Sequence, residues 1–233
     1  MTLSLRLRPS TFAAALIVLW AVAATTTQAA PEAELLERWT RHDVASNRVL
    51  NHGLWRDFLQ RYVVADDDGI HRVDYANVSP DDGGLLRVYI DDLQRTPVSQ
   101  LRRAEQFAYW VNLYNAVTVK LVLERYPVQS IREISISPGL FSKGPWGARL
   151  IKVEGENLSL DDVEHRILRP IWRDARNHYA VNCAALSCPN LAREPSTAAN
   201  TEALLDAGAR AYVNHPRGVR IEQGQLIVSS IYH

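Results

Sequence analysis

The segment LRRAEQFAYWVNLYNAVTVKLVLERYP, residues 101 to 127, constrains the fold of this chain more than any other part of the sequence. Its large side chains recur at helical spacing on one broad face, and Pro127 ends the pattern. The side chains on this face are Phe107, Trp110, Val111, Tyr114, Val117, Thr118, Leu121 and Val122. The sequence therefore predicts a long helix with an aromatic-rich buried face.

Three amide side chains follow the edge of that predicted helix. Asn112 and Asn115 are three residues apart, and Gln106 precedes them on the same helix. Amides beside a buried face need hydrogen-bond partners, so they either hold neighbouring loops or orient a catalytic group or a substrate. We take Asn112 as a candidate catalytic residue, and Asn115, Gln106, Trp110 and Tyr114 as candidate binding residues.

The remaining elements are predicted to be short. Further helices are predicted at residues 31 to 62, 85 to 93 and 196 to 214. Ser159 and Asp162 resemble a capping box at the start of another helix, which Pro170 would end. Strands are predicted at residues 61 to 65, 70 to 75, 149 to 153, 178 to 183, 219 to 222 and 225 to 230.

These elements predict an α+β protein with a small mixed or antiparallel sheet flanked by helices. A doubly wound fold is not expected, because strands and helices do not alternate regularly. A length of 233 residues suits a single domain with an appendage. We therefore divide the chain into a signal peptide at 1–29, a helical N-terminal extension at 30–96 and a main domain at 97–233.

The first residues have the order of a secretory signal. Arg6 and Arg8 precede an apolar run that ends at Ala24, and small residues follow up to Ala29. The apolar run is shorter than the roughly 20 residues that a membrane-spanning helix needs. The sequence thus predicts cleavage after Ala29 and a periplasmic or secreted protein whose mature chain has no membrane span.

The charge of the chain indicates no particular class of partner. Twenty-six basic residues balance twenty-six acidic ones, so no net field attracts nucleic acid or an anionic membrane. We expect no nucleic-acid partner and no cofactor. A small-molecule or peptide-like ligand is the partner class that remains, and the sequence does not determine the oligomeric state.

Among seven histidines, His165 is the favoured general base. It follows Glu164 on a predicted helix, with Asp161 one turn earlier on the same side. A carboxylate held against one imidazole nitrogen would fix the tautomer and raise the basicity of the other nitrogen. An ordinary surface histidine in a charged helix is the alternative. His178 competes, because it begins the predicted strand that leads to Cys183.

Cys183 and Cys188 are the two cysteines of the chain, and three interpretations of them stay open. In an exported protein two cysteines favour a disulfide, and four intervening residues can turn back far enough to form one. A cysteine that ends a strand before a turn of small residues can instead be a nucleophile, since backbone amides lower its pKa. Metal binding would need His165, His178 or Glu164 as further ligands, and the cysteine spacing is longer than the common zinc motif. We assign no metal ligands, and we take His178 and Cys188 as candidate binding residues.

Four segments, FAYWVNLYNAVTVKLVLERYP, LSLDDVEHRILRP, HYAVNCAALSCPNL and ARAYVNHPRGVRI, occur in this order along the chain. Together they resemble the domain of unknown function 547 family (DUF547), from about Leu101 to Ile231. The resemblance implies a secreted or periplasmic bacterial protein of mixed α and β structure. Enzymatic and metal-binding roles are discussed for this family without an agreed activity.

The resemblance also bears on single residues. Carried over onto this sequence, the family's asparagine-rich helix, Glu-His pair and cysteine block fall on Asn112, Asn115, Glu164, His165, Cys183 and Cys188. Some members have serine where this chain has Cys188 and keep the other cysteine, which favours Cys183 acting with His165 over an obligatory disulfide. Relatives continue past the segment that ends here at SSIYH, so the resemblance implies a truncated reading frame or a lost C-terminal tail.

Two main function classes follow from the sequence. The first is a cysteine-dependent hydrolase or acyltransferase acting on an amide, ester or thioester, with Cys183 as nucleophile and His165 as base. Glu164 or Asn112 would orient that base. The second is a noncatalytic binding module, in which Cys183 and Cys188 form a disulfide and the long helix lines a ligand pocket. A metal-binding protein is a lesser alternative, and the sequence favours the enzyme slightly.

Overall fold

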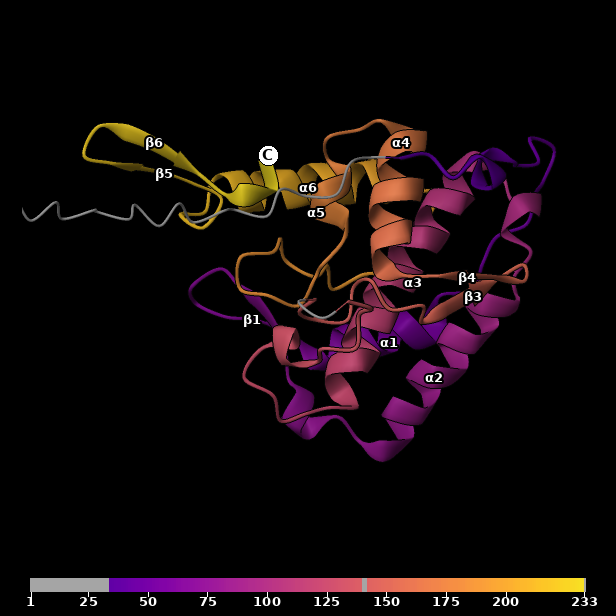
Figure 1. Ribbon diagram of the computed structural model, residues 1–233, viewed down its shortest axis with the longest axis horizontal. Helices are drawn as coiled ribbons and strands as arrows, with labels where there is room; N and C mark the ends of the chain where they lie inside the picture. Colours follow the sequence, from indigo (N-terminus) through magenta and orange to yellow (C-terminus); the bar gives the residue numbers. More distant parts are fainter. Residues whose placement is uncertain (1–33, 140–141, 233) are drawn as a thin grey trace, which may run out of the picture.

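The structure, a computed structural model, describes residues 34–139 and 142–232. The secretory signal predicted at 1–29 lies outside these residues. Figure 1 shows a mainly helical body from which one hairpin projects. The α-helices are α1 (Gly53–Tyr62), α2 (Pro80–Arg95), α3 (Arg103–Leu123), α4 (Arg169–Trp172), α5 (Asn177–Ala180) and α6 (Thr201–Val213).

Several shorter helical segments connect these helices. The π-helix η5 (Asp162–Leu168) leads directly into α4. The 3-10 turns are η1 (Glu37–Thr40), η2 (Tyr75–Asn77), η3 (Val98–Gln100), η4 (Ile131–Glu133) and η6 (Ser230–Tyr232). The helix predicted at 85 to 93 is confirmed as the middle of α2, and the one predicted at 196 to 214 is confirmed as α6.

Strands in the described residues form three separate two-stranded antiparallel hairpins. They are β1 (Val63–Ala65) with β2 (His71–Val73), β3 (Ile151–Val153) with β4 (Glu156–Leu158), and β5 (Val219–Glu222) with β6 (Gln225–Val228). The predicted α+β class is confirmed, but the strands lie in three pairs rather than in one sheet. Pairs this short gain little stability alone, so helices must supply most of the core.

The long helix predicted from the sequence is confirmed as α3. Every side chain from Glu105 to Val119 is buried, so neighbours cover α3 around its whole circumference rather than on one broad face. A helix covered on all sides forms the centre of a core. Its polar side chains are therefore buried too, and each of them needs a partner.

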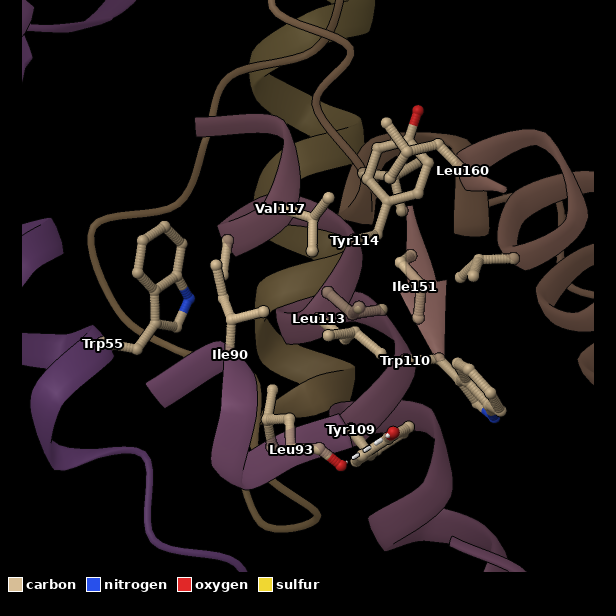
Figure 2. Packing of buried hydrophobic residues seen from close by; sticks show 14 of the residues in the cluster. Trp55, Ile90, Leu93, Tyr109, Trp110, Leu113, Tyr114, Val117, Ile151 and Leu160 are labelled. Atoms are coloured by element: carbon tan, nitrogen blue, oxygen red, sulfur yellow. Dashed lines mark hydrogen bonds between the residues drawn. The ribbon is translucent and has the colours of Figure 1, made fainter. Parts of the chain in front are cut away.

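Helices and a hairpin pack against opposite sides of α3. Figure 2 shows Trp55 of α1 and Ile90 of α2 on one side, and Ile151 of β3 on the other. The hydroxyl of Tyr109 in α3 donates to the carbonyl of Leu93 in α2 at 3.0 Å. Each large apolar side chain buried here contributes about 1.5–3 kcal/mol. These contacts make α3 the fixed element against which the candidate site residues are placed.

The N-terminal part of the described chain shares this core. The rings of Trp39 and Trp110 meet edge to face, with centroids 5.1 Å apart. Trp39 and Trp55 belong to the same cluster of buried side chains as α3. No helix within the described ranges combines the length and the apolar character that a bilayer crossing requires.

Two local predictions near the cysteines are wrong. The strand predicted at 178 to 183 begins as the helix α5, and the backbone becomes extended only at Val181. Six residues with weak alternation do not distinguish a strand from a short helix. Pro170 does not end the preceding helix, because hydrogen bonding changes from π-helical to α-helical at Arg169. That change places Pro170 in a first turn, where its missing N–H needs no partner.

Candidate functional site

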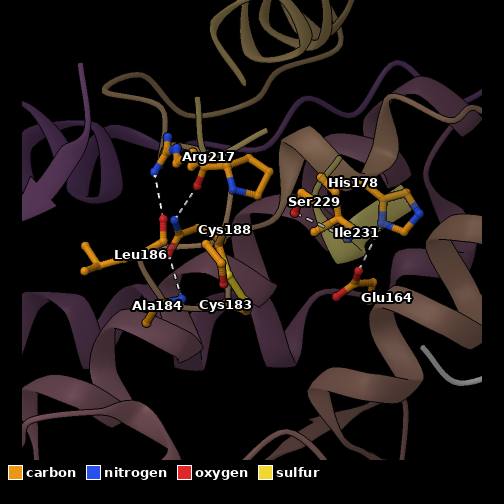
Figure 3. The surroundings of a disulfide bond; sticks show 12 residues. Glu164, His178, Cys183, Ala184, Leu186, Cys188, Arg217, Ser229 and Ile231 are labelled. Atoms are coloured by element: carbon orange, nitrogen blue, oxygen red, sulfur yellow. Dashed lines mark hydrogen bonds and ion pairs between the residues drawn. A yellow bond between two sulfur atoms is a disulfide. The ribbon is translucent and has the colours of Figure 1, made fainter. Parts of the chain in front are cut away.

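The two cysteines are joined to each other. Cys183 and Cys188 form a disulfide with their Cα atoms 6.0 Å apart, shown in Figure 3. In this state Cys183 has no thiolate with which to attack a substrate. The side chain of Asn182 braces the same turn, since its amide donates to the Pro189 carbonyl at 2.6 Å and its oxygen accepts from the Ala184 N–H at 2.9 Å.

Asn112 and Asn115 hold neighbouring backbone segments against α3. Asn112 donates to the Ser196 carbonyl at 2.7 Å and accepts from the Ser196 N–H at 3.0 Å. Asn115 donates to the Ala180 carbonyl at 2.9 Å and accepts from the Asn182 N–H at 2.8 Å. Both amides therefore hold loops, which is the first of the two interpretations that the sequence allowed. Asn112 contacts none of the other candidate catalytic residues through these bonds.

The other three candidates on α3 also contact residues of the fold. They are Gln106, Trp110 and Tyr114. The amide of Gln106 donates to the carbonyls of Arg41 and Val98, each at 2.8 Å. Trp110 and Tyr114 are fully buried in the core around α3. These three side chains are not on the wall of the cavity described next, and their role as binding residues stays a prediction.

A cavity of about 260 Å³ lies between α3, α6 and the segment from Asn190 to Ser196, and we call it the α3–α6 cavity. Most of its wall is aromatic or aliphatic, with Trp55, Phe107 and Leu204 among the lining side chains. Asn112 and Asn115 reach the same wall, but backbone partners occupy their hydrogen-bonding groups. The cavity therefore presents mainly apolar surface to a ligand.

A carboxylate–imidazole pair forms between Glu164 and His178. One oxygen of Glu164 lies 3.5 Å from Nδ1 of His178, and the other accepts from the Tyr114 hydroxyl at 3.1 Å. Burial opposes the ionisation of Glu164, but His178, His165 and Tyr114 together hold its pKa below the usual value. Figure 3 shows Glu164 and His178 in the surroundings of the disulfide.

His165 does not make the carboxylate contact predicted for it. Its Nδ1 lies 3.0 Å from Nη1 of Arg169, and because arginine only donates, that nitrogen is an acceptor. Burial is the largest cause that lowers the pKa of His165. The charge of Glu164 raises this pKa and the charge of Arg169 lowers it, and the pKa remains below its usual value. The imidazole that lies beside a carboxylate is thus His178, and the role of His165 as general base stays a prediction.

The helical stretch that carries Glu164 begins with the predicted capping box. The Ser159 hydroxyl accepts from the Asp162 N–H at 3.1 Å, and the Asp162 carboxylate accepts from the Ser159 N–H at 2.8 Å. The residues that follow form the π-helix η5, a rare geometry that occurs frequently at functional sites. Burial, and then the charges of Glu164 and Asp162, raise the pKa of Asp161 to about 6.

A second and more open concavity of about 530 Å³ lies beside α4 and α5, and we call it the α4–α5 cleft. Charged side chains make up a larger part of its lining than of the first cavity, where Arg193 and Glu194 are the charged residues. The polar and aromatic residues of its wall are Arg169, Arg173, Asp174, His178, Tyr179 and Tyr232. The Glu164–His178 pair therefore reaches this cleft through its imidazole.

Neither this cleft nor the Glu164–His178 pair was predicted from the sequence. Glu164 and His178 lie on η5 and α5, with α4 between them, so no periodicity relates their positions. His165 was predicted as the general base instead, because it follows Glu164 directly in the sequence. Within residues 34–139 and 142–232, no three histidine, cysteine, aspartate or glutamate side chains are grouped as a metal site requires.

Comparison with known proteins places the chain in a family. A family model described as "Protein of unknown function, DUF547" matches residues 98–213. This range includes α3, η5, both cysteines and α6. No curated protein matches the chain, and no solved structure matches it either.

Proposed function

The chain belongs to the DUF547 family, and from this premise we propose that it is a binding module that holds a small apolar ligand in the α3–α6 cavity. The observation that carries the proposal is the predominantly apolar wall of that cavity. Small-molecule sites are typically apolar concavities with a few placed polar groups. A neutral ligand buried there loses contact with water and needs no charged partner from the protein.

The contacts around the cavity favour a wall that is formed before the ligand arrives. Asn112 fixes Ser196 on one side of the cavity through two hydrogen bonds. Asn190 and Leu191, which also line it, follow Cys188 of the disulfide after Pro189. A preformed wall reduces the entropy that binding must offset. Burying about 150 Å² of apolar ligand surface would then contribute about 4 kcal/mol, which corresponds to a Kd of about 1 mM.

Calorimetric titration of the purified protein with naphthalene, a neutral probe, tests this proposal. Leu204→Trp places an indole ring in the cavity. Val213→Trp places the same ring at an exposed position of α6 outside the cavity. We expect wild type and Val213→Trp to bind equally, and Leu204→Trp to bind at least about tenfold more weakly. Equal binding by Leu204→Trp, or no binding by wild type, would refute the proposal.

A cysteine-dependent hydrolase or acyltransferase is the second candidate function. The observation in its favour is the Glu164–His178 pair, which lies in the surroundings of Cys183 (Figure 3). Such a pair is the arrangement that activates a nucleophile, although Cys183 must first be released from its disulfide by a thiol reductant. His178 then replaces His165 as the base in this candidate.

Labelling of the reduced protein with a thiol-reactive probe across pH tests that second candidate. If His178 activates Cys183, labelling of Cys183 should persist below the pH at which a free thiol reacts, and His178→Gln should abolish that reactivity. His42→Gln, at an exposed histidine outside this cluster, is the matched control and should leave the profile unchanged. A profile that is the same in wild type and His178→Gln would remove the hydrolase from consideration.

We also propose that the chain is exported, because residues 1–29 have the order of a secretory signal. A disulfide between its two cysteines is compatible with an oxidising compartment. N-terminal sequencing of the protein recovered from its cells should give Ala30 as the first residue. An intact Met1 in that material would contradict the proposal.

A further inference from the structure

The α4–α5 cleft carries a positive charge that its own acidic residue does not neutralise. Both carboxylate oxygens of Asp174 are occupied by Arg176, which donates through its backbone N–H and its guanidinium at 2.7–3.1 Å. Arg173, in contrast, uses only Nε for a hydrogen bond within the described residues, to the Pro170 carbonyl at 3.3 Å. The two terminal nitrogens of Arg173 are therefore available to a ligand with an anionic group.

The backbone of Arg173 fixes the place from which this guanidinium extends. Arg173 is the C-cap of α4, with φ 50° and ψ 32° in the left-handed region. A side chain that is not glycine adopts this conformation at a cost of roughly 1 kcal/mol or more. Its N–H remains bonded to the Arg169 carbonyl at 3.1 Å, so the turn that ends α4 is closed at the cleft.

His178 supplies a second ligand-binding group in the same cleft. Its Nδ1 faces the Glu164 carboxylate, which places the proton of the neutral ring on Nδ1. The other ring nitrogen, Nε2, makes no hydrogen bond within the described residues. With the proton on Nδ1, Nε2 is an acceptor, and it can receive a hydrogen bond from a hydroxyl group of a ligand.

Aromatic rings form the remaining wall of the cleft. The hydroxyls of Tyr179 and Tyr232 are hydrogen-bonded to each other at 3.3 Å, which ties α5 to the C-terminal turn η6. The rings of Tyr179 and Tyr212 lie 5.8 Å apart at their centroids, so the wall is backed by a further ring. Flat aromatic ligands pack favourably against such surfaces.

From these groups we infer that the α4–α5 cleft binds a small aromatic carboxylic acid that carries a hydroxyl group. The ligand carboxylate pairs with the guanidinium of Arg173, and its hydroxyl donates to Nε2 of His178. The ring lies against Tyr179 and Tyr232. This site differs from the α3–α6 cavity, whose wall is predominantly apolar, although Tyr179 lines both.

Calorimetric titration with 4-hydroxybenzoate, benzoate and phenol tests the inference. Arg173→Gln should weaken binding of both acids about tenfold or more and leave phenol unaffected. His178→Gln should weaken 4-hydroxybenzoate about fivefold but change benzoate less than about twofold, because benzoate has no hydroxyl to donate. Arg87→Gln, an exposed arginine of α2 outside the cleft, is the matched control and should bind as wild type.

Three outcomes would overturn the inference. They are no binding of 4-hydroxybenzoate to wild type, equal binding by Arg173→Gln, or loss of binding in Leu204→Trp, which would place the acid in the α3–α6 cavity. Circular dichroism of each variant verifies that it is folded. Loss of naphthalene binding with retained 4-hydroxybenzoate binding would refute the proposed function alone, so the two proposals fail separately.

Discussion

The α3–α6 cavity and the α4–α5 cleft treat their polar groups in opposite ways. At the cavity, the amides of Asn112 and Asn115 are occupied by backbone partners, so the wall that remains is apolar. At the cleft, Arg173 and His178 keep nitrogens that no described residue engages. Polar side chains thus stabilise the fold at the cavity, whereas at the cleft they are candidate ligand contacts.

Polar atoms that lack a partner within the fold therefore distinguish a binding role from a structural role better than residue type does. Asparagines in an aromatic helix suggested a ligand site from the sequence, and each of them proved to hold a loop. The most informative side chains at the cleft, Arg173 and His178, have no distinctive spacing in the sequence. Substitutions at Asn112, at the disulfide and at Asp161 test these structural roles.

Asn112→Ala should lower the free energy of unfolding by about 2–4 kcal/mol. The variant leaves the N–H and the carbonyl of buried Ser196 without their partner, and each lost bond of this kind costs about 1–3 kcal/mol. Urea denaturation measures the loss. Asn214→Ala, which removes an exposed amide that donates to Arg210, should change stability by less than about 0.5 kcal/mol.

A similar loss in both asparagine variants would show that the wall of the α3–α6 cavity does not depend on Asn112. The structural role assigned to Asn112 would then be wrong. Asn112→Ala should also weaken naphthalene binding while leaving 4-hydroxybenzoate binding at the cleft unchanged. The reason is that Ser196 lines the cavity but not the cleft.

Replacing both cysteines, in Cys183→Ser with Cys188→Ser, should lower the free energy of unfolding by about 2 kcal/mol. The disulfide closes a short loop, and a loop of this size restricts the unfolded chain by about that amount. Denaturation with and without a reductant measures the effect. The reductant should destabilise wild type to the level of the double variant and leave the variant itself unchanged; insensitivity of wild type would contradict the expectation.

Asp161→Asn should alter how stability depends on pH, by about 1 kcal/mol after allowance for solvent screening. Burial raises the pKa of Asp161 to about 6, so the folded state favours the protonated carboxyl. That contribution is present below pH ~4 and is lost as pH rises through about 6. Relative to wild type, the variant should therefore become more stable between pH 4.5 and pH 7.

Urea denaturation at both pH values measures this difference. Asp67→Asn is the control, because that aspartate is exposed in the turn between β1 and β2. It should follow the pH dependence of wild type. A constant difference between Asp161→Asn and wild type across the range would show that burial and the neighbouring carboxylates do not raise the pKa of Asp161.

Local signals in the sequence predicted the local parts of the fold. Helical spacing placed α3, and the pair Ser159 and Asp162 placed the start of the helical stretch that contains η5. Both depend on residues within a few positions of each other, where periodicity and capping operate. The predicted helix end at Pro170 was wrong, because residue spacing does not predict the change of helix type at Arg169.

Long-range contacts account for what the sequence did not predict. The burial of α3 on all sides depends on α1, α2 and β3, and the pairing of Glu164 with His178 depends on how α4 brings η5 and α5 together. The choice between disulfide and thiol at Cys183 also rests on the path of the turn to Cys188. Residue patterns indicated Glu164, His178 and Cys183 as candidates but did not predict which residues they contact.

The hairpin β5–β6 projects away from the body, as Figure 1 shows, and its side chains Ile221 and Leu226 are 76% and 66% exposed. It is joined to the core at its base, where a Cβ atom on Gly218 would lie 2.1 Å from the Tyr212 carbonyl oxygen. No side chain of β5 or β6 belongs to the buried cluster around α3, so the hairpin can open without disturbing that packing. Its amide hydrogens should exchange with deuterium through local opening, whereas those of α3 should exchange only when the whole protein unfolds.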